Sequence, residues 1–300
     1  MRKHFLILVA LIVCLSAIRT HAQDFTKVEI KVTKVNGNVY MLEGAGGNIG
    51  VSVGPDGILI VDDQFAPLAD KIKAALKILG DGKLKFVLNT HYHGDHTGGN
   101  VVFGPDAPII AQTNVRKRLS EEQKSKFFNR TTPPSPREAL PVITFDESVS
   151  VFFNGEEIKV IHFPHGHTDG DSVIFFTGSN VVHMGDDFFN GRFPVVDLEA
   201  GGDVEGMTKN VGDIIERLTK LPALKIIPGH GPLSDLAGLR EFHRMLVETT
   251  DIVRKRMAAG KTLDQIKAEG LPDEWKSWGT GFIKTDLWLT LVYNSLSAKH

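Results

Sequence analysis

Cysteine is nearly absent from this sequence, since Cys14 is the only one among 300 residues. A single thiol excludes an intramolecular disulfide and the paired cysteines of a Cys-rich zinc finger. Neither sign of charge is in excess, because 34 Lys and Arg stand against 36 Asp and Glu, which leaves a formal net charge of −2. The sequence therefore lacks the basic surplus of a nucleic-acid surface and the acidic tract of a disordered tail. With 42% hydrophobic residues it is an ordinary globular chain, and its one unusual count is twelve histidines.

Long apolar runs are confined to the N-terminus, where residues 5–18 are almost entirely hydrophobic. Arg2 and Lys3 precede this run and Thr20-His21-Ala22 follows it, an order typical of a secretory signal peptide. The run is shorter than the ~20 residues of a comfortable transmembrane helix. We therefore predict a signal peptide over residues 1–22, cleaved near Ala22, and a periplasmic or secreted protein.

Cleavage at this point changes the composition of the mature chain. It removes Cys14 and three basic residues, which leaves 31 basic and 36 acidic residues, a net charge of −5 and no thiol. A thiol-free chain suits an oxidising compartment, and no later apolar stretch approaches membrane length, so we expect no membrane association after cleavage. An uncleaved membrane anchor is one alternative. A lipoprotein attached at Cys14 is another, although Val13 is bulky for the position before a lipidated cysteine.

Strand and turn signals occur in both halves of the mature chain. In the first half, Asn36-Gly37 is a strong hairpin turn, and the expected strands are residues 28–35, 38–43, 48–53, 57–61 and 84–88, with a helix over 66–79. The second half repeats this order, with expected strands at residues 149–153, 158–163, 172–177, 181–183 and 223–227 and a helix over 204–220. Two β-layers with helices outside them are the natural architecture for such a pattern, which belongs to the α/β class.

The two halves are joined by a polar, proline-bearing stretch at residues 129–141. We interpret it as a surface loop within one fold, and we therefore predict a single domain over residues 23–300. Helical patterns near residues 234–259, 263–268 and 285–296 predict a C-terminal helical extension over about 234–300.

The histidines cluster directly after predicted strands. His91-Tyr92-His93-Gly94-Asp95-His96 follows the strand at 84–88 and offers four potential metal ligands in six residues. Such a cluster is hard to explain by packing, because unsatisfied buried polar groups are costly. The alternative is a solvated, histidine-rich loop.

Three further motifs occupy equivalent places after later strands: His165-Gly166-His167-Thr168, Gly185-Asp186-Asp187 and Pro228-Gly229-His230-Gly231. Each is weak alone, because a single His or Asp after a strand is commonly a satisfied loop residue. Strand ends on one edge of a layered fold converge, so their shared placement predicts a metal site assembled from distant segments. Three other histidines, His162, His183 and His243, are interpreted as structural.

The motifs His-x-His-x-Asp-His, Gly-His-Thr, Gly-Asp and Gly-His-Gly, in this order over residues 28–232, resemble those of the metallo-β-lactamase superfamily. The resemblance implies a four-layer αβ/βα sandwich with a two-metal site on the edge between the β-layers. It implies one zinc held by His91, His93 and His167, a second held by Asp95, His96 and His230, and Asp186 as the bridging ligand. His165 competes with His167 for its place, but Gly-His-Thr fits the family pattern at His167.

These ligand types also make chemical sense by themselves. Imidazole and carboxylate are good zinc ligands, and an open position on each metal makes a site catalytic. Two zincs ~3.5–4 Å apart can share a hydroxide whose parent water has a pKa lowered toward ~7, and this hydroxide attacks a carbonyl or phosphoryl centre. Asp95 is the candidate for steadying the leaving group and relaying its proton. Iron and manganese accept the same ligands.

Asp62 occupies the place in the first half that matches the Asp186 motif in the second. It is a candidate acceptor for the N–H of a ligand imidazole, with a helix-cap or turn role as the alternative. The substrate pocket is predicted from residues that flank the metal motifs: Phe65, Phe188, Phe189, Arg192 and Phe193. Arg192 is also a candidate partner for a substrate carboxylate, and an exposed loop arginine is the alternative.

Departures from the best-known zinc β-lactamases bear on the substrate. Many of those enzymes have a cysteine ligand where this chain has Asp186, which instead resembles the bridging residue of glyoxalase II, lactonases and phosphodiesterases. The flavodiiron branch has Glu where His93 stands, which disfavours oxygen reduction. We therefore predict a dinuclear zinc hydrolase acting on a small carbonyl substrate: a lactone, ester, thioester or β-lactam.

Three alternatives to this function stay open. They are a β-lactamase proper, a mononuclear iron oxygenase similar to the sulfur dioxygenases, and a non-catalytic role in binding a metal or a partner. The aromatic residues near the C-terminus are interpreted as core packing, with a homodimer face or a cap over the pocket as alternatives: Trp275, Trp278, Phe282, Trp288 and Tyr293.

Overall fold

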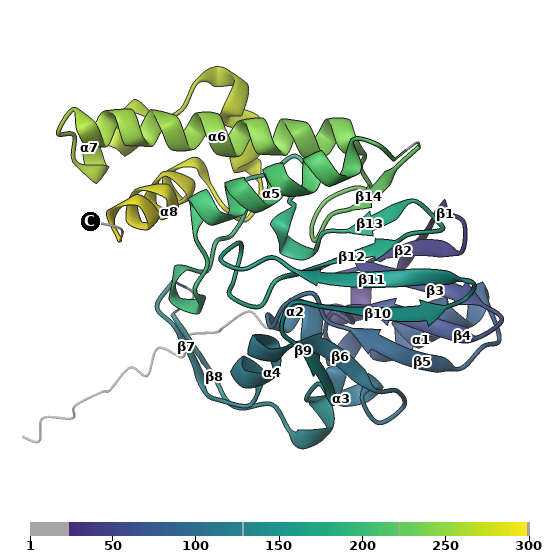
Figure 1. Cartoon of the computed structure of the whole chain (residues 1–300). Helices are drawn as coiled ribbons and strands as arrows, with labels where there is room; N and C mark the ends of the chain where they lie inside the picture. Colours follow the sequence, from purple (N-terminus) through teal and green to yellow (C-terminus); the bar gives the residue numbers. More distant parts are fainter. Residues whose placement is uncertain (1–23, 128, 222, 299–300) are drawn as a thin grey trace, which may run out of the picture.

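The computed structural model describes residues 24–127, 129–221 and 223–298 (Figure 1). The predicted signal peptide over residues 1–22, and Cys14 with it, lie outside the described residues. Within the described part of the chain, no helix combines the length and the apolar character that crossing a membrane requires.

The first half of the chain forms a seven-stranded sheet with the order β1-β2-β3-β4-β5-β6-β9. Its members are β1 (Lys31–Asn36), β2 (Val39–Glu43), β3 (Ile49–Gly54), β4 (Gly57–Val61), β5 (Leu84–Leu88), β6 (Ile109–Gln112) and β9 (Ile143–Phe145). The first four strands form an antiparallel meander, and β5, β6 and β9 then add in parallel to β4. The crossover from β4 to β5 runs through η2 (Ala66–Leu68) and α1 (Ala69–Leu79).

The second half repeats this plan in a five-stranded sheet with the order β10-β11-β12-β13-β14. Its members are β10 (Ser148–Phe153), β11 (Glu156–His162), β12 (Ser172–Phe176), β13 (Val181–His183) and β14 (Lys225–Ile227). Antiparallel pairing again ends in one parallel pair, β13 with β14, whose crossover contains α5 (Val204–Leu218). Both sheets therefore send the carboxyl ends of two parallel strands to the same edge of the molecule.

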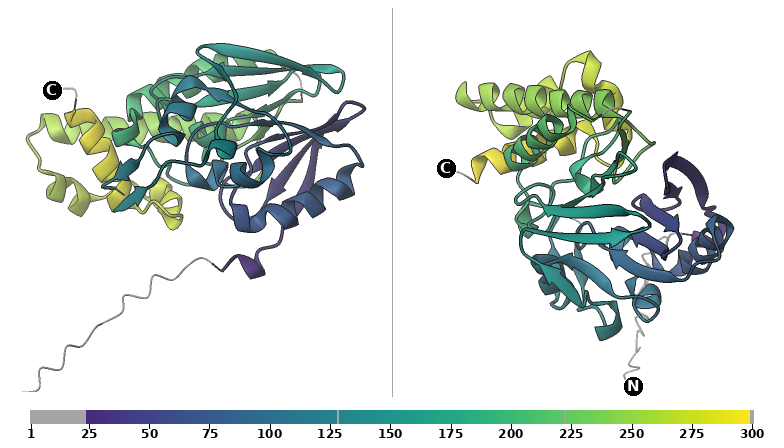
Figure 2. Two further views of the ribbon diagram at one scale, coloured as in Figure 1. Left: turned by 90° about the horizontal axis from the view of Figure 1, so that it is seen from below. Right: turned by 45° about the vertical axis from the view of Figure 1, so that its right-hand side comes forward.

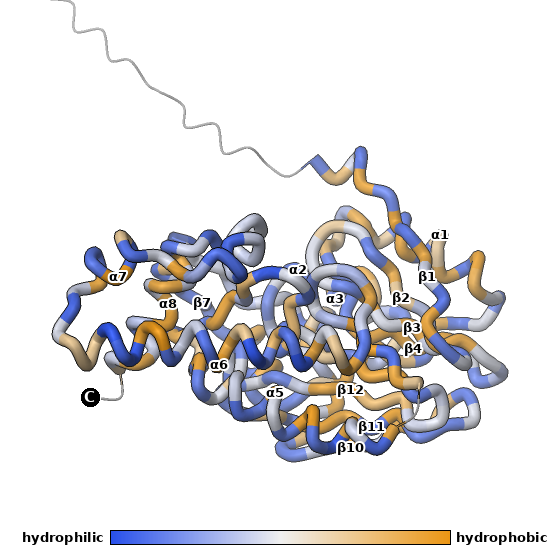
Figure 3. The backbone as a smooth tube through the Cα atoms, turned by 90° about the horizontal axis from the view of Figure 1, so that it is seen from above, coloured by the Kyte–Doolittle hydropathy of each residue, from blue (hydrophilic) through white to orange (hydrophobic). Residues whose placement is uncertain are grey.

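The C-terminal helices cover the outer face of the second sheet, whereas α1 covers the outer face of the first (Figures 1 and 2). This layer contains α5, α6 (Leu236–Ala258), α7 (Leu263–Glu269), the 3-10 helix η6 (Asp273–Thr280) and α8 (Thr285–Ser297). Along α6 hydrophobic and hydrophilic stretches alternate, as expected of a helix with one buried face (Figure 3). The predicted four-layer αβ/βα sandwich with extra C-terminal helices is confirmed.

Alternation along β4 explains how the layers are held together. Leu59 and Val61 point into the core between the sheets, where they meet residues such as Ile174 of the second sheet. Ile58 and Ile60, which alternate with these two residues along the strand, point the other way and pack under α1. All five residues of β4 are buried because a sheet with covered faces needs apolar side chains on both.

Several short elements escaped the sequence prediction, most of them between residues 94 and 145. They include β6, β9, the small pair β7 (Gln123–Ser125) and β8 (Arg130–Thr132), and the helices α2 (Gly94–Thr97), α3 (Asn100–Phe103) and α4 (Thr113–Leu119). All of these except α4 are three or four residues long, which is too short to display a period. The connection expected as loop over 129–141 thus contains β8 and the 3-10 helix η3 (Arg137–Ala139). The strand expected from residue 223 begins at Lys225, because Ala223 adopts a left-handed conformation (φ 50°).

Two isoleucines of α1 provide a matched test of this packing. Ile72 is 0% exposed under the first sheet, whereas Ile78 on the same helix is 81% exposed. We expect Ile72→Ala to lower the free energy of unfolding by about 2–5 kcal/mol, because it leaves a cavity. The control Ile78→Ala should change it by less than about 0.5 kcal/mol. Urea denaturation measures both values, and similar losses in the two variants would contradict the described packing of α1.

Candidate metal centre

The side chains singled out in the sequence come from loops at the edge where the parallel strands end. His91 and His93 follow β5, and Asp95 and His96 lie in the short helix α2 directly after them. The other three come from the second half of the chain: His167 from the loop between β11 and β12, Asp186 from the 3-10 helix η4 (Gly185–Asp187) after β13, and His230 from the loop after β14.

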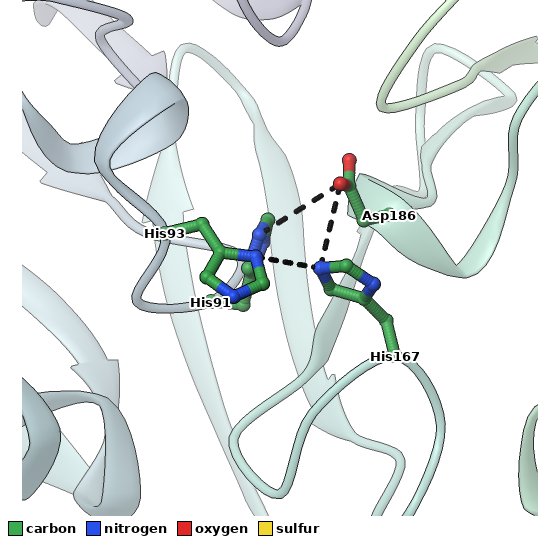
Figure 4. Close-up of side chains that lie close together, drawn as sticks. All are labelled: His91, His93, His167 and Asp186. Atoms are coloured by element: carbon green, nitrogen blue, oxygen red, sulfur yellow. Dashed lines mark hydrogen bonds and ion pairs between the residues drawn. The ribbon is translucent and has the colours of Figure 1, made fainter. Parts of the chain in front are cut away.

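Four of these residues form a first donor cluster: His91, His93, His167 and Asp186 (Figure 4). One potential ligand atom from each lies within 4.8 Å of those of the others. His93 Nδ1 is 2.8 Å from His167 Nε2, and Asp186 Oδ2 is 3.5 Å from His167 Nε2 and 3.9 Å from His91 Nε2. Three imidazoles and a carboxylate thus face one point.

A second donor cluster, Asp95, His96 and His230, lies on the other side of Asp186. The Oδ1 atom of Asp186 is 3.0 Å from His96 Nε2 and 3.4 Å from His230 Nε2. Asp95 Oδ2 is 3.3 Å from His230 Nε2. One carboxylate therefore directs its two oxygens to the two clusters.

The neighbouring carboxylates make the two clusters electrostatically different. Burial lowers the pKa of His91 well below its ordinary value and that of His167 to about 4, so both rings are neutral near pH 7. For His230, burial acts in the same direction, but the carboxylates of Asp186 and Asp95 outweigh it and raise its pKa to about 9. A cation in the second cluster would take the place of the positive charge that the imidazoles now supply.

Most of the imidazoles have their other ring nitrogen occupied by an oxygen outside the clusters. His96 Nδ1 is 2.7 Å from Asp62 Oδ2, His167 Nδ1 is 2.8 Å from the carbonyl of Val195, and His93 Nε2 is 2.9 Å from Asp197 Oδ2. His91 Nδ1 lies 3.0 Å from the hydroxyl of Thr90, which itself donates to Asp62. This pattern orients the remaining nitrogens and is typical of histidines that bind metals.

Asp62 is fully buried and lies against His96, where the sequence singled out an acceptor. It also accepts hydrogen bonds from the backbone N–H and the hydroxyl of Thr90, at 2.8 and 2.7 Å. No side-chain cap is found at the start of η2 or of α1, so the alternative role as a helix cap has no counterpart there. Asp62 adopts a positive φ of 63°, which aims its carboxylate at this loop edge.

His165, the rival of His167, lies outside both clusters. Its side chain is exposed, its backbone is left-handed (φ 58°), and its Nδ1 faces the carbonyl of Gly201 at 3.2 Å. Of the three histidines interpreted as structural, His183 is fully buried and its Nε2 lies 3.0 Å from the carbonyl of Asn48. The left-handed backbone at His165 turns its side chain to solvent, whereas His167 two residues later is fully buried.

The residues predicted for the pocket wall divide into two groups. Phe189 stacks on His230 with ring centroids 5.0 Å apart, so it forms an apolar surface beside the second cluster. Phe65 lies near Gly46 in the loop above Asp95. Arg192 packs its aliphatic stem against Gly281, near the C-terminal helices.

Phe188 and Phe193 correct the prediction, because both are buried in the helical layer. Phe188 is 0% exposed and packs on Phe242, and Phe193 is 1% exposed and stacks on Trp288 at 5.5 Å. Nearness to a ligand in sequence does not fix the direction of a side chain, and the adjacent rings of Phe188 and Phe189 have different neighbours.

Two features that shape the site were not predicted from the sequence. Gly47 approaches His96 so closely that a Cβ there would lie 2.1 Å from the imidazole, so only glycine fits. The second feature is a short segment in which the Asp197 carboxylate contacts His93 and the carbonyl of Val195 contacts His167. The run Gly44-Ala45-Gly46-Gly47 was a visible signal for the first feature, whereas nothing in the sequence marked Asp197.

Comparison with known proteins places this arrangement in context. The profile of the Metallo-beta-lactamase superfamily matches residues 32–230. Hydroxyacylglutathione hydrolase from Prochlorococcus marinus (strain MIT 9301) is 29% identical over 141 residues, covering 46% of this chain and 47% of the relative. The enzyme of the same name from Rhodospirillum rubrum is 28% identical over 162 residues, covering 53% and 52%. The chain therefore spans about half the length of these curated relatives.

Solved structures share the fold at low identity. DIM-1 metallo-β-lactamase superposes with a TM-score of 0.59 at 19% identity, covering 73% of this chain and 98% of that one. A double mutant of the sec-alkyl sulfatase PisA1 superposes with a TM-score of 0.68 at 16% identity, covering 89% and 50%. The profile match takes in all seven residues of the two donor clusters. The chain belongs to the metallo-β-lactamase superfamily.

Proposed function

We propose that this protein is a dinuclear zinc hydrolase that cleaves a small carbonyl substrate: a lactone, ester, thioester or β-lactam. The observation that carries the proposal is the position of Asp186 between two donor clusters, with one carboxylate oxygen toward each. We also propose that residues 1–22 export the protein to the periplasm or the exterior.

The residues of both clusters fit metal ions. Buried His91 Nε2 makes no hydrogen bond, which is costly for a buried polar atom unless a cation occupies the point it faces. Neutral imidazoles and carboxylates are the ligands that zinc prefers, and iron and manganese accept the same set. When bound, two zincs supply a water with a pKa near ~7 and polarise the substrate oxygen. In this proposal His91, His93 and His167 would hold one ion, and Asp95, His96 and His230 would hold the other. Asp186, with one oxygen toward each cluster, would be a ligand shared by both.

Asp95 and Phe189 each have an additional role in this proposal. The side chain of Asp95 is 32% exposed, the largest value among the seven ligand candidates, and its Oδ2 faces His230. That position suits it to carry a proton to the leaving group as the scissile bond breaks. The ring of Phe189, stacked on His230, keeps water away from one side of the cluster.

A thioester is the first substrate to test, because the curated relatives are named hydroxyacylglutathione hydrolases. A β-lactamase proper is an alternative within the same chemistry. A mononuclear iron oxygenase would need only the first cluster, and the second donor cluster favours a dinuclear site instead.

The proposal is tested on mature protein starting at Gln23, by metal analysis and a substrate panel. The panel contains a glutathione thioester, an acyl-homoserine lactone, a penicillin, a carbapenem and a phosphodiester. We expect close to two zincs per chain and hydrolysis of at least one carbonyl substrate. About one zinc per chain or fewer, since a single ion cannot make a two-metal site, or no hydrolysis across the panel, would overturn the proposal. Iron content with oxygen consumption would establish the oxygenase instead.

His93→Ala and His165→Ala form a matched pair of variants for the same panel. The first removes a member of the first cluster, and the second removes an exposed histidine outside it. We expect His93→Ala to lower kcat/KM by more than about 100-fold, beyond the usual effect of losing an outer hydrogen-bond partner. His165→Ala should keep wild-type activity. Equal activities in the two variants would exclude the first cluster from the reaction.

Asp62→Asn tests the outer support of the second cluster. Its loss of charge weakens the hydrogen bond from His96 Nδ1, so we expect zinc affinity to fall by about 10–100-fold. Competition with a chromophoric chelator measures this affinity. The control is Asp63→Asn, because burial raises the pKa of Asp63 well above its ordinary value and its carboxylate accepts from backbone N–H groups such as that of Gly99. If both variants bind zinc equally well, Asp62 has no part in holding the ion.

A further inference from the structure

A short segment of the chain, residues 195–197, passes behind the first donor cluster and contacts two of its imidazoles. The carbonyl of Val195 accepts a hydrogen bond from His167 Nδ1 at 2.8 Å. The backbone N–H of Asp197 donates to the carbonyl of His167 at 2.9 Å, and the Asp197 carboxylate lies 2.9 Å from His93 Nε2. These three contacts couple the orientation of both rings to one piece of backbone.

The carboxylate of Asp197 is buried, and each of its oxygens has a separate partner. Oδ2 accepts from the hydroxyl of Tyr92 at 2.7 Å as well as from His93. Oδ1 accepts from the backbone N–H of Ala200 at 3.0 Å and so caps the 3-10 helix η5 (Leu198–Ala200). Both oxygens therefore act as acceptors, as those of an ionised carboxylate do.

An ionised carboxylate and a backbone carbonyl can only accept hydrogen bonds. The ring of His93 must therefore carry a proton on Nε2, and the ring of His167 must carry one on Nδ1. Their other nitrogens, His93 Nδ1 and His167 Nε2, then present lone pairs to each other at 2.8 Å. Two lone pairs at this distance repel unless a cation or an extra proton lies between them, so the segment prepares the rings for a cation.

The segment is itself held by the C-terminal helical layer. The backbone N–H of Phe193 donates to the carbonyl of Trp278 at 3.1 Å, and the Phe193 ring stacks on Trp288. Phe193, which was predicted to lie in the pocket wall, therefore anchors the segment that leads to Asp197.

We propose that Asp197 is a positioning residue, which fixes the tautomer and ring orientation of His93 so that Nδ1 faces the first cluster. This role rests on the proposed metal centre, and Asp197 does not itself contact a substrate. It assigns the C-terminal helices a part in holding the site, through Phe193 and the segment 195–197.

Asp197→Asn separates this role from the capping of η5. Asparagine Oδ1 can still accept from Ala200, because Asn caps helices as well as Asp does. The amide NH₂ that replaces Oδ2 is a donor, so it cannot accept from His93 Nε2–H and favours the opposite tautomer. We expect zinc affinity to fall by about 10–100-fold in chelator competition, with little change in the urea midpoint. Tyr92→Phe is the matched control, because it removes the other partner of Oδ2 and keeps the contact with His93.

A second measurement makes the test independent of how the variants fold. Nitrogen-15 NMR of the metal-free wild-type protein reports which nitrogen of His93 carries the proton. We expect a proton on Nε2 of His93 in the wild type and in Tyr92→Phe, and its loss in Asp197→Asn. The Nδ1–H tautomer in the wild type, or wild-type zinc affinity in a folded Asp197→Asn variant, would overturn the positioning role. Failure of the wild type itself to bind zinc would overturn the proposed function instead.

Discussion

The carboxylate of Asp186 faces two groups of imidazoles at once, and the arrangement of the rest of the site depends on that position. Its two oxygens lie 3.0 Å from His96 and 3.5 Å from His167, which belong to different donor clusters. A buried charge of this kind is tolerated only where compensating positive charge surrounds it. Burial acts to raise the pKa of Asp186, but the neighbouring imidazoles, His96 first among them, hold it well below its ordinary value. The site is thus assembled around one buried carboxylate that faces both donor clusters.

The fold supplies that geometry through two of its parallel strand pairs. The pair β4–β5 is followed by Asp62 and His91, and the pair β13–β14 is followed by Asp186 and the loop carrying His230. The two sheets pack face to face, so these four ends meet at one edge. The outer hydrogen bonds then decide which nitrogen of each ring faces inward. Fold and site are therefore linked in the first few residues after each of these strands.

Much of this arrangement is readable from the sequence because strand ends carry a local signal. The strand β5 is followed within three residues by His91, and the same order of strand and polar residue recurs at Asp186 and His230, so their convergence was predictable. The helices α5, α6 and α8 were predictable from their long apolar period. Asp197 was not, because it lies in an irregular loop and its partner His93 is remote in sequence. Only the folded chain brings them within 2.9 Å. The wall residues show the same limit, since sequence places Phe188, Phe189 and Phe193 near the site but does not say which of them turn into the core.

The separation of the two parallel strand pairs along the chain has a consequence for synthesis. His91 to His96 emerge from the ribosome long before His230, and the helices that hold Phe193 come later still. A chain that has been made only as far as β12 therefore has the histidines of the first motif but no Asp186 beside them. The two donor clusters can be completed only once the chain as far as His230 is available.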